Sequence, residues 1–99
     1  MAEHATVVDV SRYYPAGGKR DELLDAMRGL ASAASSANGC FGAQVCTSDQ
    51  DGEALVAVSR WESQAALDAF AADPGFVGER ERLAGLLGKP AEREHLHSA

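Results

Sequence analysis

The chain has 99 residues, of which 45% are hydrophobic and 24% charged, and its net charge is −6 at neutral pH. We expect one domain over residues 1–99, whose modest core would gain from a partner subunit. The acidic balance argues against nucleic acid and anionic membranes as partners. No apolar run in the sequence reaches the roughly 20 residues of a membrane span.

Two further features bear on where the protein works. The first ten residues, MAEHATVVDV, lack the basic start and long apolar region of a signal peptide, so we expect a cytoplasmic protein. Cys40 and Cys46 lie in one predicted strand, about 20 Å apart at 3.3 Å per residue, which is too far for a disulfide. No CxxC spacing indicates a zinc site, and we predict no metal.

The first half of the chain alternates between strand and helix patterns. β-Branched and aromatic residues predict a strand over residues 5–14, which the sequence PAGG stops. A helix is predicted over residues 19–36, because apolar residues recur at spacings of four, three and four. These residues are Leu23, Met27, Leu30 and Ala34. Asn38 and Gly39 follow as its predicted end.

Two strands are predicted next, over residues 40–47 and 54–61, and Asp51-Gly52 between them favours a hairpin. Ser63 is a suitable N-cap for a second helix, which runs through QAALDAFAA. Asp73-Pro74 predicts the start of a third helix, placed over residues 76–87 and closed by Gly88. Residues 91–97 alternate weakly and predict a fourth strand.

The order β-α-β-β-α-β, with the second helix broken in two, predicts a ferredoxin-like α+β fold with an antiparallel sheet. The strand over residues 54–61 is apolar on both sides: Val56 and Val58 on one, and Leu55, Ala57 and Trp61 on the other. Helices of the same chain would cover one side, so we expect a homodimer joined through the other sheet face.

In the third predicted helix, Arg80 is a charged residue on the apolar face. At about 100° per residue it falls between Leu87 and Ala84, on the apolar stripe formed with Phe76 and Leu83. A charge that faces a core is costly unless something pairs with it. Arg80 therefore lines a pocket, extends out of the groove, pairs with an acid such as Asp9, or stacks on Trp61.

The segments TVVDVSRYYPAGGKRDELLDAMRGL and RWESQAALDAFAADPGF resemble the antibiotic biosynthesis monooxygenase (ABM) superfamily of small dimeric α+β barrel proteins. The most specific part is Trp-Glu-Ser at a strand end, followed by a helix and Asp-Pro. The resemblance covers most of the chain. It implies the dimeric barrel fold and a small-molecule pocket between helices and sheet.

One branch of this superfamily oxidises anthrone-type polyketides to quinones with molecular oxygen and no cofactor. The resemblance to it implies a monooxygenase acting on a small aromatic compound. Trp61 and Arg80 match the branch's pocket tryptophan and arginine, so Trp61 would form an aromatic wall and Arg80 would hold an oxyanion. The other residues expected to bind substrate are Tyr13 or Tyr14, as a hydrogen-bond donor, with Leu67, Phe70 and Phe76.

Three positions depart from that branch. Ala57 stands where it has an asparagine, Thr47 where it has a histidine, and Leu67 where it has an aromatic residue. The alternative is therefore a non-enzymatic, small-molecule-binding or stress-associated dimer of the same fold. An open pocket of roughly 300 Å³ or more would favour a ligand, and a filled helix–sheet interface would favour a structural role.

Two other ligands are disfavoured by the sequence. A haem-degrading branch uses a histidine on the last helix, but Arg80 stands at that position and arginine does not ligate haem iron. His95 and His97 share a strand face in a spacing that can bind a metal, yet no third ligand accompanies them. We expect these histidines to lie at a solvated chain end.

Overall fold

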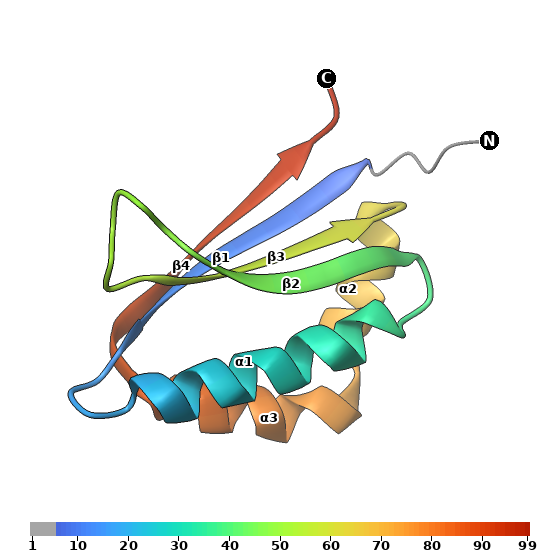
Figure 1. The fold of residues 1–99 in the computed structure, drawn as a ribbon. Coiled ribbons are helices and arrows are strands. Elements are labelled where there is room, and N and C mark those ends of the chain that lie inside the picture. Colours follow the sequence, from blue (N-terminus) through green and yellow to red (C-terminus); the bar gives the residue numbers. More distant parts are fainter. Residues whose placement is uncertain (1–5) are drawn as a thin grey trace.

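The computed structural model describes residues 6–99, in which an antiparallel sheet carries helices on one face (Figure 1). The elements are β1 (Val7–Pro15), α1 (Arg20–Ser35), β2 (Cys40–Thr47), β3 (Leu55–Trp61), α2 (Gln64–Ala72), α3 (Pro74–Ala84) and β4 (Leu87–His97). The strands lie in the order β2-β3-β1-β4. The predicted ferredoxin-like α+β fold, with its divided second helix, is confirmed.

Local sequence signals account for both ends of the divided helix. The hydroxyl of Ser63 accepts a hydrogen bond from the backbone N–H of Ala66 at 3.1 Å, which caps α2. The carboxylate of Asp73 accepts one from Gly75 at 2.8 Å, and Pro74 occupies the first turn of α3. The two predicted helix starts are therefore confirmed.

The predicted end of α3 is wrong. The helix ends at Ala84 instead of residue 87, and β4 begins at Leu87 instead of residue 91. The backbone N–H of Ala16 donates to the carbonyl of Leu86 at 2.9 Å, and Leu87 is opposite Pro15 in the sheet. Leu87, the last residue of the predicted helical stripe, is therefore part of the sheet because it pairs with β1.

Other observed boundaries lie close to those predicted from the sequence. The predicted first position of strand one, residue 5, lies outside the described residues, and β1 ends at Pro15. Its pairing with β4 shifts register between Arg12 and Tyr14 and again between Tyr14 and Pro15. Gly39, the predicted helix end, has a φ of +81° but lies in the turn after α1, whose cap is Ser36.

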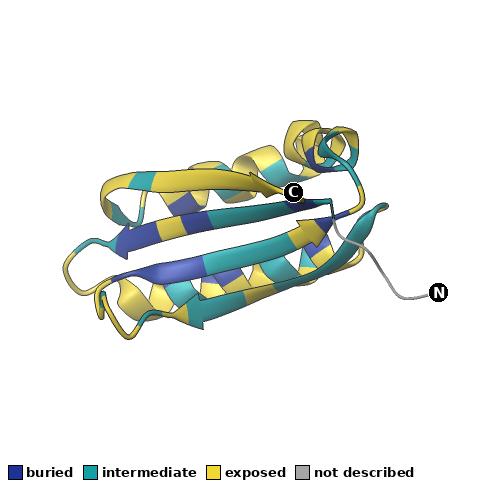
Figure 2. Ribbon diagram, turned by 90° about the horizontal axis from the view of Figure 1, so that it is seen from above, coloured by how far each residue is buried: buried dark blue, intermediate teal, exposed yellow. Residues whose placement is uncertain are grey.

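The sheet has two unlike faces. Tyr13 packs with Leu23, Met27 and Leu55 on the helix side, whereas Tyr14 packs on the other side in a cluster with Ala54 and Val56. Figure 2 looks onto the side without helices, where β1 and β3 carry buried and half-buried residues and β4 is mostly exposed. The two neighbouring tyrosines thus lie on opposite faces of the sheet.

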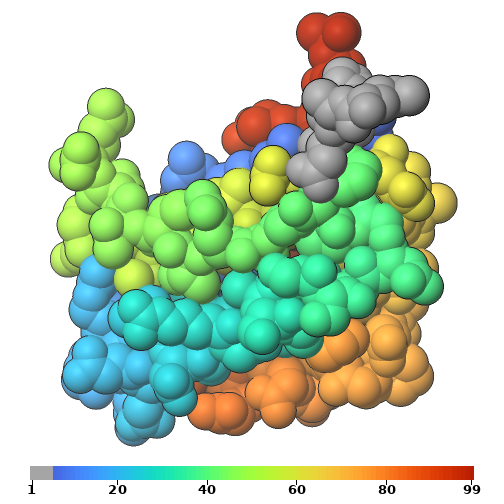
Figure 3. Space-filling model, turned by 45° about the vertical axis from the view of Figure 1, so that its right-hand side comes forward, coloured from blue at the N-terminus to red at the C-terminus, as the bar shows by residue number. Residues whose placement is uncertain are grey.

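The helices form a layer against the sheet. Figure 3 shows α1 lying along β2, with α3 beside it on the side away from the sheet's bare face, and the β2–β3 connection projecting at one end. Within residues 6–99, no helix has the length and apolar character needed to cross a membrane.

Candidate functional site

A cavity of about 630 Å³ lies between the helix-bearing face of the sheet and the three helices. Its helix side is mostly apolar, with Asp68 and Arg80 as charged exceptions. The residues there include Met27, Leu30, Leu67, Phe70 and Leu83. The volume exceeds the roughly 300 Å³ of a small-molecule pocket, so the helix–sheet interface is not filled by side chains and has room for a ligand.

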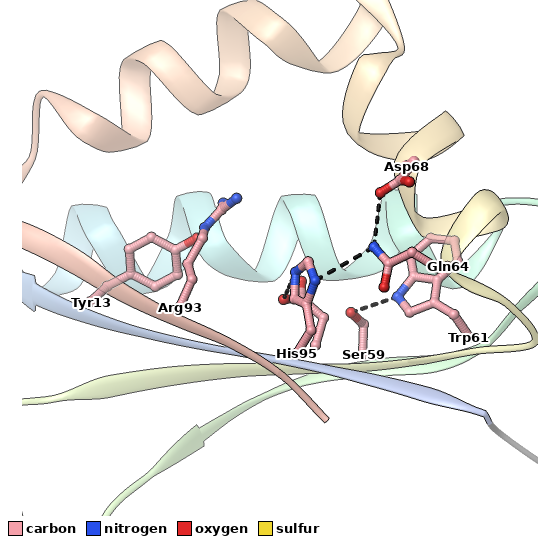
Figure 4. A network of polar contacts seen from close by, with 8 residues as sticks. Tyr13, Ser59, Trp61, Gln64, Asp68, Arg93 and His95 are labelled. Carbon is pink, nitrogen blue, oxygen red and sulfur yellow. Dashed lines mark hydrogen bonds and ion pairs between the residues drawn. The ribbon is translucent and has the colours of Figure 1, made fainter. Parts of the chain in front are cut away.

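The sheet side of the cavity is polar. Asp9 on β1 lies opposite Ser59 on β3 and opposite His95 on β4, so these three side chains form one row across the sheet. Ser11 lies opposite Arg93 in the next row. Figure 4 shows the side chains of Tyr13, Ser59, Arg93 and His95 rising from the strands toward the helices. Antiparallel register, rather than proximity in sequence, therefore gathers the polar groups.

His95 lies at the centre of this polar wall. Its Nε2 atom is 3.3 Å from Oδ1 of Asp9, and its Nδ1 atom is 3.5 Å from Nε2 of Gln64. The same Gln64 nitrogen donates to Oδ1 of Asp68 at 2.9 Å (Figure 4). With the Gln64 amide in this orientation its nitrogen can only donate, so the contact assigns the acceptor role to Nδ1 and the neutral ring's proton to Nε2.

The carboxylate of Asp9 contacts the ring of His95. Its Oδ1 atom is buried and has no hydrogen bond in the described structure, so the contact with the His95 ring is its one close polar partner. The pair therefore places an imidazole and a carboxylate together on the cavity wall.

Arg93 and Tyr13 form a second polar pair. Nη2 of Arg93 donates to the phenolic oxygen of Tyr13 at 3.2 Å, and both residues line the cavity. Burial lowers the pKa of Arg93, but the hydrogen bond to Tyr13 and the charge of Asp9 outweigh it, so the pKa is raised above its ordinary value. Arg93 thus carries a permanent positive charge at the cavity wall.

Arg80 lines the cavity, but its donors are directed at the end of α2. Nη1 donates to the carbonyl of Ala71 at 2.6 Å, and Nη2 donates to the carbonyl of Phe70 at 3.2 Å. The guanidinium carbon also lies 5.7 Å from the centre of the Phe70 ring. Of the alternatives open from the sequence, pairing with Asp9 does not occur, since Asp9 contacts His95. Arg80 instead ties α3 to the last turn of α2.

The other residues expected at the site separate into two groups. Tyr13, Leu67 and Phe70 line the cavity. Trp61 is fully buried behind Phe70, with ring centres 5.4 Å apart, and its Nε1–H donates to Ser59 at 2.8 Å. Phe76 packs on the Phe70 ring at 4.6 Å. The structure therefore places Trp61 and Phe76 in support of a lining residue rather than on the lining itself.

Tyr14 does not line the cavity, because it points to the opposite sheet face. Its hydroxyl donates to Oε1 of Glu92 at 2.6 Å, and this hydrogen bond, with burial, raises the pKa of Tyr14 to about 12. Of the positions that depart from the anthrone-oxidising branch, Ala57 lines the cavity. Thr47 is exposed at the end of β2 and is not among the lining residues.

Sequence reasoning did not assign Asp9, Gln64, Arg93 and His95 to the site. His95 was expected at a solvated chain end, yet it faces the cavity with its side chain 39% exposed. The available signal was strand alternation. Ala91 packs against the core, and Arg93 and His95 follow it at spacings of two, which puts all three on one strand face.

The cysteines do not form a disulfide with each other. Cys40 and Cys46 are free thiols, both half-buried. In the part of the chain that the structure describes, no group of three or more histidine, cysteine or acidic residues is arranged to hold a metal ion.

The chain is an α+β protein whose ferredoxin-like sheet has a ligand-sized cavity under its helices. A model of one family, antibiotic biosynthesis monooxygenase, matches residues 6–78. The chain belongs to this family. The resemblance noted in the sequence is thereby confirmed.

Solved structures share the fold at low sequence identity. The Rv0793 protein of Mycobacterium tuberculosis superposes with a TM-score of 0.86 at 23% identity, with 96% of each chain covered. A conserved protein of Methanosarcina mazei gives 0.87 at 18% identity, with 96% of this chain and 94% of that chain covered. SnoaB of Streptomyces nogalater, a cofactor-independent oxygenase, gives 0.83 at 19% identity, with the same coverages. No curated protein matches the chain.

Proposed function

We propose that this protein is a cofactor-independent monooxygenase that oxidises a small aromatic compound of the anthrone or quinol type with molecular oxygen. The observation that carries the proposal is the His95–Asp9 pair, 3.3 Å apart, on the polar sheet wall of a cavity of about 630 Å³ whose helix side is mostly apolar. Family membership and the similarity to a cofactor-independent oxygenase support the same reaction class.

Such a reaction asks little of the protein beyond removing a proton. In anthrone oxidation a ring methylene becomes a carbonyl. One atom of O2 becomes the carbonyl oxygen, and the other leaves as water with the two hydrogens. The four electrons that reduce O2 come from the substrate. The carbanion or phenolate formed by deprotonation is the species that gives electrons to oxygen, so a base in a dry cavity is the central requirement.

His95 is the base in this proposal. Its Nδ1 atom takes the substrate proton once the ligand displaces the long contact from Gln64, which spans 3.5 Å. Asp9 stabilises the imidazolium that results, because its buried oxygen faces Nε2. The imidazolium in turn stays beside the substrate anion in an apolar cavity, where such a charge pair is strong.

The remaining residues shape the cavity. Leu67 and Phe70 provide the apolar surface for a flat ring, and Trp61 and Phe76 hold Phe70 in place. Arg80 fixes the end of α2 that carries these side chains. In this scheme Arg80 positions the cavity and does not hold the oxyanion.

The test is an oxygen-uptake screen over anthrones, hydroquinones and flavonols without added cofactor. We expect turnover of at least one class, and we expect His95→Asn to lower kcat by about a hundredfold or more, the usual contribution of a general base. His97→Asn is the matched control, because His97 is exposed at the strand end and does not line the cavity. Full activity in His95→Asn would exclude this residue as the base.

The second candidate is a non-enzymatic ligand-binding protein of the same fold. The observation in its favour is Ala57, which presents only a methyl group to the cavity where the anthrone-oxidising branch has an asparagine. Calorimetric binding of the same compounds, with no oxygen consumed by any of them, would favour this candidate over the oxygenase.

We also propose that the protein works as a homodimer through the sheet face that bears no helix. Tyr14, Val10, Val56 and Val58 form an apolar cluster there. Helices of the same chain lie on the opposite face (Figure 1). A second copy of the chain would therefore bury this apolar cluster, as in a symmetric dimer. Sedimentation at micromolar concentration should give twice the 10.4 kDa chain mass, and a stable monomer would remove this proposal.

A further inference from the structure

We infer that Arg93 and Tyr13 form a carboxylate-binding subsite, so that the natural ligand is an aromatic acid whose carboxylate lies at this pair. The inference deepens the proposed function by naming a substrate class, and it rests on that function only for the statement that the ligand is also oxidised. The binding part stands on the contacts of these two residues.

The charge of Asp9 acts on Arg93, but no acidic side chain of the described residues contacts Arg93 directly. Over residues 6–99, Arg93 makes no ion pair, and its one hydrogen bond is the donation to the Tyr13 hydroxyl at 3.2 Å. A guanidinium has five N–H donors, so most of them remain available. Figure 4 shows the Arg93 side chain rising from β4 toward the helices beside Tyr13.

The other charges at the cavity have partners, which sets Arg93 apart. Arg80 donates to two helix-end carbonyls, and Lys89 lies 4.0 Å from the centre of the Tyr14 ring. Asp9 contacts His95, and Asp68 accepts from Gln64. None of these cavity side chains forms a direct ion pair with Arg93, and an anionic ligand can do so.

Tyr13 adds a second donor. Its oxygen accepts the hydrogen bond from Arg93, and its own O–H has no acceptor in the described part of the chain. Tyr13 is buried and held among Leu23, Met27 and Leu55, so the hydroxyl is fixed in position. An Arg N–H and a Tyr O–H that converge in this way match the two oxygens of a carboxylate.

The position of the subsite relative to His95 gives the ligand an orientation. Arg93 and His95 are two residues apart on one strand face, which corresponds to about 7 Å. A ligand anchored by its carboxylate at Arg93 therefore extends its ring along the strand, over His95. The proton to be removed would lie on the part of the ring remote from the carboxylate.

The experiment is calorimetric titration, without oxygen, of naphthoate and of naphthamide with the same ring isomer. The amide keeps the ring and removes the charge. We expect naphthoate to bind about tenfold to a hundredfold more tightly, the effect of charged hydrogen bonds. Arg93→Gln should abolish this preference, and Tyr13→Phe, which keeps the buried ring, should reduce it.

Arg12→Gln is the matched control. Arg12 is an exposed arginine on β1 that does not line the cavity, so the preference should be retained. The net charge of −6 disfavours non-specific attraction of an anion, so a preference that depends on Arg93 reports a local site. Equal binding of acid and amide, no binding of the acid, or a preference that survives Arg93→Gln would overturn the inference.

The outcome is independent of the oxygen-uptake screen. A carboxylate preference without oxygen consumption would contradict the oxygenase and leave the subsite standing. Turnover of neutral substrates without any carboxylate preference would contradict the subsite and leave the oxygenase standing.

Discussion

Arg80→Ala tests the capping role of an arginine that lies on an apolar helix face. In the structure its guanidinium donates to the carbonyls of Ala71 and Phe70, at 2.6 and 3.2 Å, and so caps α2 from α3. The change removes both hydrogen bonds and the favourable interaction of a cation with a helix C-terminus. Stability should therefore fall, although neither partner is an acid.

The magnitude follows from these contacts. Hydrogen bonds to charged groups contribute about 1.5 to 3 kcal/mol each when buried. Because Arg80 is only half-buried, water can replace part of each bond, and we take about 1 kcal/mol for each. The helix-end charge adds about 0.3 to 1 kcal/mol. A loss of about 2 to 3 kcal/mol lowers the Tm of a domain this size by roughly 10 to 20 °C.

The assay is thermal unfolding followed by circular dichroism, with Arg82→Ala as the control on the same helix. Arg82 pairs with Glu79 at 3.5 Å, and both side chains are more than half exposed. Such surface pairs contribute less than about 1 kcal/mol, so this variant should melt within a few degrees of the native protein. If the two variants melted together and Arg80→Ala instead lost ligand binding, the capping role would be refuted in favour of a direct role at the ligand.

Three further predictions concern separate parts of the molecule. Tyr14 should titrate with a midpoint near pH 12 by ultraviolet absorbance, against 10.0 in the unfolded chain. Since its folded pKa is raised, its contribution to stability is complete below pH 10 and is lost as the pH rises toward 12. Glu92→Gln should lower the midpoint. Gly39→Ala should destabilise by about 1 to 3 kcal/mol in urea unfolding, because φ is +81° and the added Cβ would lie 2.6 Å from a side-chain carbon of α2, whereas Gly52→Ala meets nothing within 4 Å and should be nearly neutral. Haem titration should give no stoichiometric Soret shift, since Arg80 stands at the ligand position of the haem-degrading branch; a sharp equimolar complex would contradict that assignment.

The fold could be predicted from local signals because those signals agree with one another. The Ser63 and Asp73 caps and the apolar stripe of α1 each occur where the sequence indicates them. The end of α3 could not be predicted in this way. Leu87 continues the helical stripe, but in the structure it pairs with Pro15, more than 70 residues earlier in the chain. Long-range pairing of this kind overrides periodicity, and one sequence does not reveal it.

The site was harder to predict for the same reason. The angular position of Arg80 indicated which way its side chain points, but not that its donors would meet carbonyls of a neighbouring helix. His95 contacts Asp9 because the two residues stand opposite each other in the sheet. That register depends on how β1 and β4 align, and no local signal in the intervening sequence indicates this alignment. Alternation within β4 alone would have placed Arg93 and His95 on the correct face, without naming their partners.

The irregular pairing of β1 with β4 has a consequence for how this cavity could change in evolution. β4 is an edge strand with β1 as its one neighbour, and its phase is set by the register shifts between Arg12 and Pro15. The family match ends at residue 78, before β4 begins. A slip of one residue would turn Arg93 and His95 to the opposite face and bring Glu92 and Glu94 to the cavity. The charge offered to a ligand would then reverse, while α1 and the other three strands kept their places.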